Sequence, residues 1–302
     1  MKKSLLFLLS LFTLSPILAQ KELYVSQYMH SRYTINSAFG GSAEALLMFG
    51  AYRKQWAGLN GAPASQFFSA HTPLKNEQIA LGVEFFGQQY AVSQTNGFAS
   101  SYTYRIRPSE NTRLGIGLNV GLSFNSAGWN QIAVKTSNDP SFESAESKAI
   151  PLLGVGAAWY GDLFFAGVSV PNFFSSNWVD YDDSQFSLGD AHYLITGGYL
   201  VKMSQTWWIQ PSALIHLSKQ YGFEADAGVN LIWNNLLWLG TSYRTTEAFV
   251  VMAGYQVMPP LRVIYSWDKS IGSIGGLNSG SHEISLRYEF GFRIPATNPR
   301  FF

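Results

Sequence analysis

The chain has 302 residues, no cysteine and a formal charge of +1 at pH 7. Charged residues make up 13% of it, well below the ~25% usual in soluble domains, whereas aromatic residues reach 16% and there are 28 glycines. Low charge with many aromatics excludes a disordered chain, and the absence of a Lys/Arg cluster excludes a nucleic-acid reader. A helical membrane protein needs runs of about 20 apolar residues, and the chain after its N-terminus has none. The composition is typical of a membrane β-barrel.

The N-terminus has the layout of an export signal. Lys2 and Lys3 precede an apolar stretch over residues 5–14, and residues 16–19 form a cleavage site. This order is that of a secretory signal peptide. Its removal leaves 18 basic and 19 acidic residues in the mature chain. An exported chain without disulfides must be stabilised in another way. A closed barrel does this because every strand is paired on both sides.

Period-two alternation predicts the strands, most clearly near the C-terminus. Ile284, Leu286 and Tyr288 alternate with Glu283 and Arg287, so the two sets lie on opposite faces. In a membrane barrel the apolar face meets lipid and the polar face lines the lumen. The same alternation recurs in three further segments, residues 101–107, 113–124 and 223–231.

Fourteen strands are predicted from these patterns. They span residues 43–53, 64–74, 77–88, 93–107, 112–125, 148–160, 162–171, 191–203, 206–218, 221–233, 235–244, 247–257, 260–269 and 281–293. Every second connection is short, and three of the others, 126–147, 172–190 and 270–280, are long, as expected for periplasmic turns and outer loops. We therefore predict a transmembrane antiparallel up-and-down β-barrel with both termini periplasmic. Twelve strands are the alternative, because residues 235–257 are weakly patterned.

The predicted organisation has four parts. A signal peptide (1–19) is followed by an N-terminal periplasmic or lumenal segment (20–42), the transmembrane barrel (43–293) and a C-terminal periplasmic tail (294–302). Tryptophans near strand ends are expected to form girdles at the two membrane surfaces. They are Trp129, Trp159, Trp178, Trp207, Trp208, Trp233, Trp238 and Trp267.

The sequence shows no catalytic constellation. Its five histidines lack metal-ligand spacing, and no Gly-x-Ser-x-Gly motif occurs. The acidic cluster of Asp180, Asp182, Asp183 and Asp190 lacks the glycine and glutamate spacing of an EF-hand loop. We expect no enzymatic activity, no cofactor and no metal.

Two irregular regions carry the candidate binding residues. The segment 20–42 is too irregular for a membrane strand, and the connection after residue 53 combines Arg, Trp, Gly and Pro residues. A purely architectural role for this loop is an equally good reading of the pattern. With the start of the last strand, the candidate partner-binding residues are Gln27, Tyr28, Met29, Asn36, Arg53, Gln55, Trp56, Gly58, Pro63, His282 and Glu283.

These motifs together resemble the PorP/SprF family of outer-membrane proteins, associated with type IX secretion in Bacteroidota. The matching stretches are residues 26–29, 35–40, 53–63, 281–284 and 298–302. Ser37 stands where a proline is expected in the family pattern. The resemblance implies a non-enzymatic component of protein secretion or gliding motility. Its partners would be a large surface adhesin or periplasmic ring proteins, with outer-membrane lipid around the wall and no nucleic acid.

The alternative function is an outer-membrane channel, such as a fatty-acid-type transporter. Composition does not separate the two, because both need the same lipid face. The predicted lumenal charges are of both signs and can pair across a filled lumen, whereas a selective pore often shows a ring of one sign. These residues are Arg105, Arg107, Arg113, Glu224, Asp226, Arg287 and Glu289.

Overall fold

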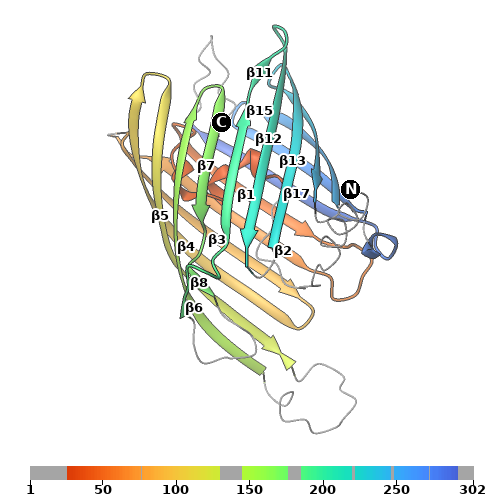
Figure 1. Ribbon diagram of the computed structural model, residues 1–302. Helices are drawn as coiled ribbons and strands as arrows, with labels where there is room; N and C mark the ends of the chain where they lie inside the picture. Colours follow the sequence, from red (N-terminus) through yellow and green to blue (C-terminus); the bar gives the residue numbers. More distant parts are fainter. Residues whose placement is uncertain are drawn as a thin grey trace, which may run out of the picture.

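The computed structural model describes residues 26–75, 77–129, 145–175, 185–219, 222–245, 248–271 and 273–291. Most of them lie in long antiparallel strands that surround a lumen (Figure 1). The strands are β1 (Leu46–Lys54), β2 (Ala64–Pro73), β3 (Ile79–Tyr90), β4 (Ser93–Ser109), β5 (Thr112–Gly128), β6 (Ala145–Gly161), β7 (Phe164–Val170), β8 (Phe174–Ser175), β9 (Gln185–Phe186), β10 (Tyr193–Tyr199), β11 (Val201–Lys202), β12 (Trp207–Ser218), β13 (Gly222–Trp233), β14 (Leu237–Arg244), β15 (Ala248–Met258), β16 (Leu261–Ser270) and β17 (Ser281–Phe290).

The strands close into a barrel. Neighbours in sequence are neighbours in the sheet, β1 pairs with β17, and β10 pairs with β12. Strand β11 continues β10 beyond Leu200. The pairing with β12 is missing at Tyr199 and Leu200, which lie opposite Pro211 and Gln210, and Pro211 has no N–H to give to the ladder. Counting β10 and β11 together, the wall has fourteen strands, which confirms the predicted number over twelve. The short β8–β9 pair lies outside the wall, in the connection between β7 and β10.

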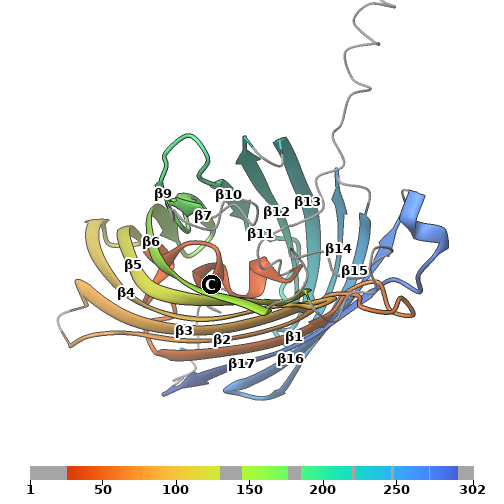
Figure 2. The ribbon, with the colours of Figure 1, turned by 90° about the horizontal axis from the view of Figure 1, so that it is seen from below.

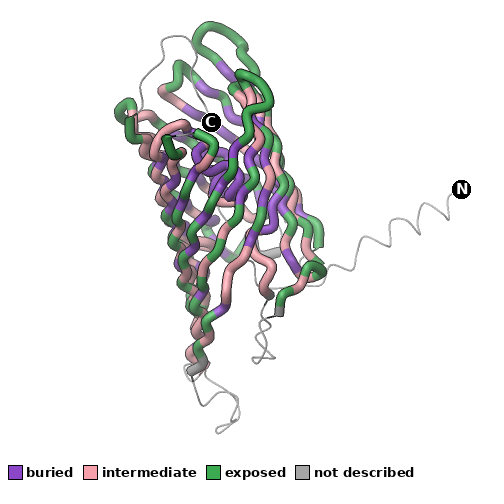
Figure 3. The backbone as a smooth tube through the Cα atoms, turned by 90° about the vertical axis from the view of Figure 1, so that its left-hand side faces the viewer, coloured by how far each residue is buried: buried purple, intermediate pink, exposed green. Residues whose placement is uncertain are grey.

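The alternation of faces is confirmed along the strands. In β5, Ile116 and Val120 are exposed on the outside, and Gly115, Gly117 and Ser123 are buried. Figure 3 shows buried and exposed positions alternating along the wall. The exposed apolar rows form the surface that meets lipid.

The two ends of the barrel differ. One end, here called the turn end, carries the short connections 74–78, 110–111, 162–163, 203–206, 234–236 and 259–260. The opposite end, here called the loop end, carries the connections 55–63, 171–192 and 271–280, the last with the 3₁₀ helix η6 (Ser273–Gly276). Asn234 and Asn235 both have positive φ, the geometry of a two-residue hairpin turn that asparagine tolerates. Strand β1 begins and β17 ends at the turn end; which membrane side this end faces stays a prediction.

Residues 26–45, here called the lumenal segment, lie inside the barrel (Figure 2). Three short 3₁₀ helices occur in it: η1 (Tyr28–His30), η2 (Arg32–Thr34) and η3 (Ser37–Phe39). Most of the residues in this segment are buried, and the others are partly buried. Among the described residues, no helix reaches the length and hydropathy needed to cross a membrane.

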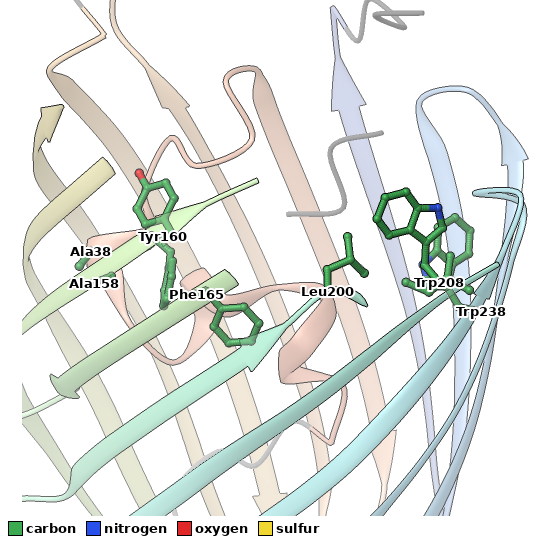
Figure 4. Close-up of a cluster of buried hydrophobic side chains, with 9 residues drawn as sticks. Ala38, Ala158, Tyr160, Phe165, Leu200, Trp208 and Trp238 are labelled. Atoms are coloured by element: carbon green, nitrogen blue, oxygen red, sulfur yellow. The ribbon is translucent and has the colours of Figure 1, made fainter. Parts of the chain in front are cut away.

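The inner face of the barrel also carries apolar side chains. Two tryptophans that were expected in the girdles at the membrane surfaces lie on this face instead. Trp208 and Trp238 point inward and are almost fully buried, rather than lying in an interfacial girdle. They form an apolar cluster with Leu200, Phe165 and residues of the lumenal segment (Figure 4). Trp159, Trp207 and Trp233 do face outward. Trp178 and three of the acidic-cluster residues, Asp180, Asp182 and Asp183, lie outside the described residues, as do the predicted signal peptide and the predicted C-terminal tail.

Candidate functional site: the lumenal segment and its contacts

An ionic network of five buried side chains occupies the loop-end half of the lumen. It consists of Arg53, Asp226, Arg244, Asp268 and Glu283, each near the loop end of its strand. Arg53 Nη2 lies 2.8 Å from Asp268 Oδ2, and Arg53 Nη1 lies 3.2 Å from Glu283 Oε2. Arg244 joins Asp226 Oδ2 at 3.2 Å and Asp268 Oδ2 at 3.4 Å. Buried charges need such partners, because desolvation of an isolated ion is costly.

The start of the lumenal segment is bound to this network. Ser26 Oγ donates to Asp268 Oδ2 at 2.6 Å and accepts from Arg53 at 2.9 Å and Arg244 at 3.1 Å. The Ser26 backbone N–H donates to Glu283 Oε2 at 2.9 Å. One serine hydroxyl therefore links both arginines to the acidic side of the network.

Gln27 extends the contacts of this end along the wall. Its backbone N–H donates to Glu283 Oε1 at 3.3 Å, and its side-chain amide donates to Ser266 Oγ at 3.1 Å. Ser285 Oγ donates to the Gln27 side-chain carbonyl. These bonds satisfy the polar groups of a side chain that has no access to water.

Apolar contacts follow in the middle of the segment. Tyr28 and Met29 pack with inward residues of β10, β12 and β15. This cluster contains Leu194, Leu214, Val250 and Met252, with Ile35 against it. Arg287 donates to the His30 carbonyl at 2.9 Å, and the Tyr33 hydroxyl bonds Ser101 at 2.7 Å.

The next part of the segment rests on a groove of wall glycines, here called the glycine groove. Its members are Gly82, Gly115, Gly117, Gly156 and Gly167, from β3, β5, β6 and β7. A Cβ on Gly117 would lie 2.4 Å from the Ala38 nitrogen, and one on Gly115 would lie 2.2 Å from the Ala38 carbonyl oxygen. Only glycine allows the segment backbone to approach the wall this closely.

Asn36 fixes the segment at the groove. Its side-chain N–H groups donate to the wall carbonyls of Ala157 and Val168, both at 3.1 Å. Its side-chain oxygen accepts from the Ala38 N–H at 2.9 Å and caps η3. A Cβ on Gly156 would lie 2.0 Å from this oxygen. The predicted Asn36 is therefore a structural link between the segment and the wall.

The end of the segment lies near the turn end. Glu44 forms ion pairs with Arg105, near the turn end of β4, and with Arg113, near the start of β5. Arg32 stacks over Phe39 and Phe165, with its guanidinium 5.1 and 4.6 Å from the ring centroids. Along β17, contacts shift from Glu283 to Ser285 to Arg287 as the segment runs from Ser26 to His30. The segment therefore runs lengthwise through the barrel, from the loop end to the turn end.

The first loop, residues 55–63, is bonded to the last loop at the loop end of the barrel. Trp56 has a φ of 44°, and its N–H donates to Ser281 Oγ at 3.2 Å. The Ala57 N–H donates to the Gly280 carbonyl at 2.8 Å, and the Ser279 N–H donates back to the Ala57 carbonyl at 2.9 Å. The loop 55–63 is thus bonded to the last loop, 271–280.

The remaining predicted residues divide between this loop and the outer wall. The Gln55 N–H donates to the Pro63 carbonyl at 2.8 Å across the loop, Gly58 is exposed at a φ of 96°, and Pro63 is buried. His282 lies on the outward face, where its Nδ1 is 2.6 Å from the Tyr265 hydroxyl. It is therefore separated from its neighbour Glu283, which points into the lumen.

The structure brings together six of the predicted residues in the lumen. They are Gln27, Tyr28, Met29, Asn36, Arg53 and Glu283. Sequence reasoning did not select Arg244 and Asp268, which complete the ionic network. Both are charged residues at inward positions near a strand end, and that pattern in the sequence could have identified them. Within the described part of the chain, no cluster of His, Asp and Glu has the arrangement to hold a metal.

The closed wall, the exposed apolar rows and the buried segment inside the lumen define an outer-membrane β-barrel that holds its own N-terminal segment. The model of the type IX secretion system membrane protein PorP/SprF family matches residues 17–288. The chain belongs to this family, and it is an outer-membrane component of type IX secretion.

Solved barrels resemble the fold at low sequence identity. Omp33 from Acinetobacter baumannii has a TM-score of 0.46 and 10% identity, and the match covers 82% of this chain and 98% of that one. A FadL homologue from Pseudomonas aeruginosa has a TM-score of 0.44 and 11% identity, over 81% and 89% of the two chains. For the KdgM porin the values are 0.40 and 8%, over 81% and 99%. A search of curated proteins returned no match.

Proposed function

We propose that this protein is a docking component of type IX secretion whose lumen is kept closed and whose protein partners bind at the barrel ends. The observation that carries the proposal is the position of residues 26–45. They lie inside the lumen, where a channel would run, and they are held there by hydrogen bonds to a buried ionic network and by apolar contacts. A substrate channel, the alternative function, would require this segment to leave the lumen.

The barrel wall offers little to a specific protein partner. Most of its backbone groups are paired between neighbouring strands, and most of its outer side chains are apolar, so lipid satisfies them equally well. Recognition is therefore assigned to the ends. The loop end suits a large exported adhesin if it faces the cell surface, and the turn end suits periplasmic ring proteins.

The predicted binding residues then have two roles. Gln27, Asn36, Arg53 and Glu283 keep the lumenal segment in place and act on partners only through the shape of the barrel ends. Trp56 shapes the loop end, where Gln55, Gly58 and Pro63 complete the same loop. Direct contact of these residues with a partner stays a prediction.

Planar-bilayer recording tests whether the lumen is closed. We expect the intact purified protein to show no large, stable conductance. A variant with its segment displaced, such as Gly117→Val, should conduct more. A wide, stable pore in the intact protein would contradict the proposal and favour the channel function.

Co-purification from native membranes tests which end binds. Leu277, in the last loop, is 69% exposed, and Met203, in a turn at the opposite end, is 64% exposed. Leu277→Ser should reduce recovery of an exported adhesin, whereas Met203→Ser should reduce recovery of periplasmic ring proteins. Each variant is the control for the other, and heat-modifiable mobility on gels reports the folded barrel. Unchanged recovery of all partners in both variants would contradict docking at these positions.

A further inference from the structure

Two cations at the turn end of the lumen stack on the inward tryptophans. The Lys202 ammonium, on β11, lies 5.5 Å from the centroid of the Trp208 ring, and the Arg262 guanidinium, on β16, lies 3.6 Å from that of Trp238. Both distances are those of cation–π contacts. Each cation lies within two residues of a short connection of the turn end, and both indoles belong to the apolar cluster of Figure 4. These four residues are here called the cationic mouth.

The two charges of the cationic mouth are not balanced by carboxylates. Among the residues that the structure describes, neither Lys202 nor Arg262 forms an ion pair. The Arg262 Nε donates to Gln256 Oε1 at 3.1 Å, and this acceptor is neutral. The lumenal carboxylates near this end, Glu44 and Glu289, pair with other arginines.

The strand register adds a contact between like charges. Arg262 lies directly opposite Arg287 in the ladder between β16 and β17. Like charges in directly opposite positions destabilise a sheet. Glu289 accepts from Arg287 Nε at 2.8 Å and so neutralises one of the two charges. The cationic mouth therefore keeps a positive charge that a bound anion would offset.

The spacing of the two cations favours a chain with several carboxylates over one small anion. Trp208 and Trp238 both pair with Ile232, one on each side, so their backbones lie two strand spacings, about 10 Å, apart. Carboxylates on one face of an extended peptide recur about every 7 Å, and their side chains can span the remaining difference. A single phosphate or free carboxylate is much smaller than this spacing and would meet one stacked cation at a time.

We infer that the cationic mouth binds an acidic segment of a protein partner at the turn end, through carboxylates that pair with Lys202 and Arg262. This inference rests on the proposed docking at the barrel ends and names the chemistry recognised at one of them. A guanidinium that stacks on an aromatic ring keeps the N–H groups of its edge available to a carboxylate. Lys202 is exposed and Arg262 is partly exposed, so both can be reached. Stacking also holds the two cations in place, which reduces the conformational freedom lost on binding.

Peptide binding to the purified full-length protein tests the inference. The probe is a fluorescein-labelled oligoglutamate, with oligoglutamine of equal length as the neutral control, and fluorescence anisotropy at fixed ionic strength gives the affinity. We expect Arg262→Gln and Lys202→Gln each to weaken oligoglutamate binding about tenfold, the effect of losing one hydrogen bond between charged groups. Arg107→Gln is the matched control, because Arg107 carries the same charge near the same end but lies on β4 and donates to the Glu110 carbonyl at 3.1 Å. It should stay within twofold of the wild type, and heat-modifiable mobility confirms that each variant forms the barrel.

Several results of this titration would overturn the site. Weakening of similar size in Arg107→Gln would show diffuse attraction to the net charge, and equal binding of oligoglutamine would show that carboxylates are not recognised. Failure of the wild type to bind oligoglutamate overturns the inference directly. Displacement of the probe by inorganic phosphate at equal ionic strength would assign the mouth to a small anion instead. Displacement by phosphatidylglycerol added to the detergent micelles would assign it to a lipid headgroup.

Co-purification from native membranes separates the inference from the proposed function. We expect Arg262→Gln and Lys202→Gln to lower the recovery of periplasmic proteins and Arg107→Gln to leave it unchanged. Equal recovery with the wild type and both mouth variants overturns the inference and leaves docking intact. If the wild type recovers no partner, the docking function fails, whereas the oligoglutamate titration still decides the chemistry of the mouth.

Discussion

The lumenal segment is held in two different ways at its two ends. At Ser26 and Gln27 it is bound by charged and polar side chains of β1, β16 and β17, several of which reach to one hydroxyl. At Asn36 and Ala38 it is held by backbone contact with glycines and by carbonyls of the wall. The first end is held by polar and charged side chains of the wall. The second end fits because the wall residues beneath it are glycines and have no side chains.

The difference predicts different sensitivities to substitution. In the ionic network, removal of one group leaves its partners buried and unpaired. In the glycine groove, any added group must displace the segment or the wall. Truncation of a side chain should therefore lower the free energy of unfolding most in the ionic network. Enlargement of a side chain should lower it most in the glycine groove.

The largest effect is expected at Arg53. Arg53→Ala leaves Asp268 and Glu283 without a cation that lies 2.8 and 3.2 Å from them. Breaking a buried pair in this way costs about 3–5 kcal/mol. The free energy of unfolding from lipid vesicles in urea measures it. Lys54→Ala, one residue along the same strand, removes a bond to the Ala62 carbonyl and should cost much less. Similar losses in the two variants would show that Arg53 is not central to the network.

Strand β5 allows both faces of the wall to be compared at adjacent positions. Leu118 is exposed on the outside, and Asn119 points inward and donates to the Pro171 carbonyl at 3.1 Å. Leu118→Arg should cost about 2–4 kcal/mol if the side chain lies near the bilayer midplane. Asn119→Arg should cost less, because its surroundings are polar. Equal costs in reversible folding into lipid would mean that the two faces are wrongly assigned.

The groove is tested at Gly117. Gly117→Ala places a Cβ against the backbone of residues 37 and 38, and overpacking of this kind costs about 1–3 kcal/mol. Gly50→Ala is the matched control, because a Cβ there has no neighbour closer than 3.9 Å. We expect a lower free energy of unfolding and a higher bilayer conductance for Gly117→Ala only. If both variants behave like the wild type, the segment does not rest on the groove.

The sequence predicted the wall because strands of a barrel share one simple period. Alternation at Ile284 and Leu286 identified the outward face, and glycines at inward positions indicated space inside the barrel. The inward position of Trp208 and Trp238 could not be read in this way, because an aromatic near a strand end fits a girdle and a lumenal cluster equally well.

The contacts of the lumenal segment could not be predicted from the sequence either. Ser26 meets Asp268 and Glu283 more than two hundred residues away, and the segment has no period of its own because the inner wall determines its shape. Charges at inward positions near strand ends were the only sign of the network. The grouping of Arg53 with Glu283 followed from a family resemblance and not from spacing.

The smallest effect is expected where charges pair outside the lumen. Asp190, in the connection between β7 and β10, accepts from Ser187 Oγ at 2.8 Å and lies 3.4 Å from the exposed Lys219 ammonium. The hydrogen bond from Ser187, and then the charge of Lys219, lower the pKa of the Asp190 carboxyl below its ordinary value. A lowered pKa means that this carboxylate favours the folded state at neutral pH and that the contribution is lost as the pH falls through the folded-state pKa.

Because water surrounds both groups of this pair, its contribution to stability should be too small to detect, in contrast to that of Arg53. The carboxyl titration is the sensitive measurement, followed by carbon-13 NMR of labelled protein. Ser187→Ala should raise the pKa of Asp190 more than Lys219→Ala does, since the hydrogen bond is the larger cause. Neither variant should change the urea midpoint of unfolding. A lower midpoint in Lys219→Ala comparable to that of Arg53→Ala would show that exposed and lumenal ion pairs contribute alike, and the contrast between the barrel interior and its loops would fail.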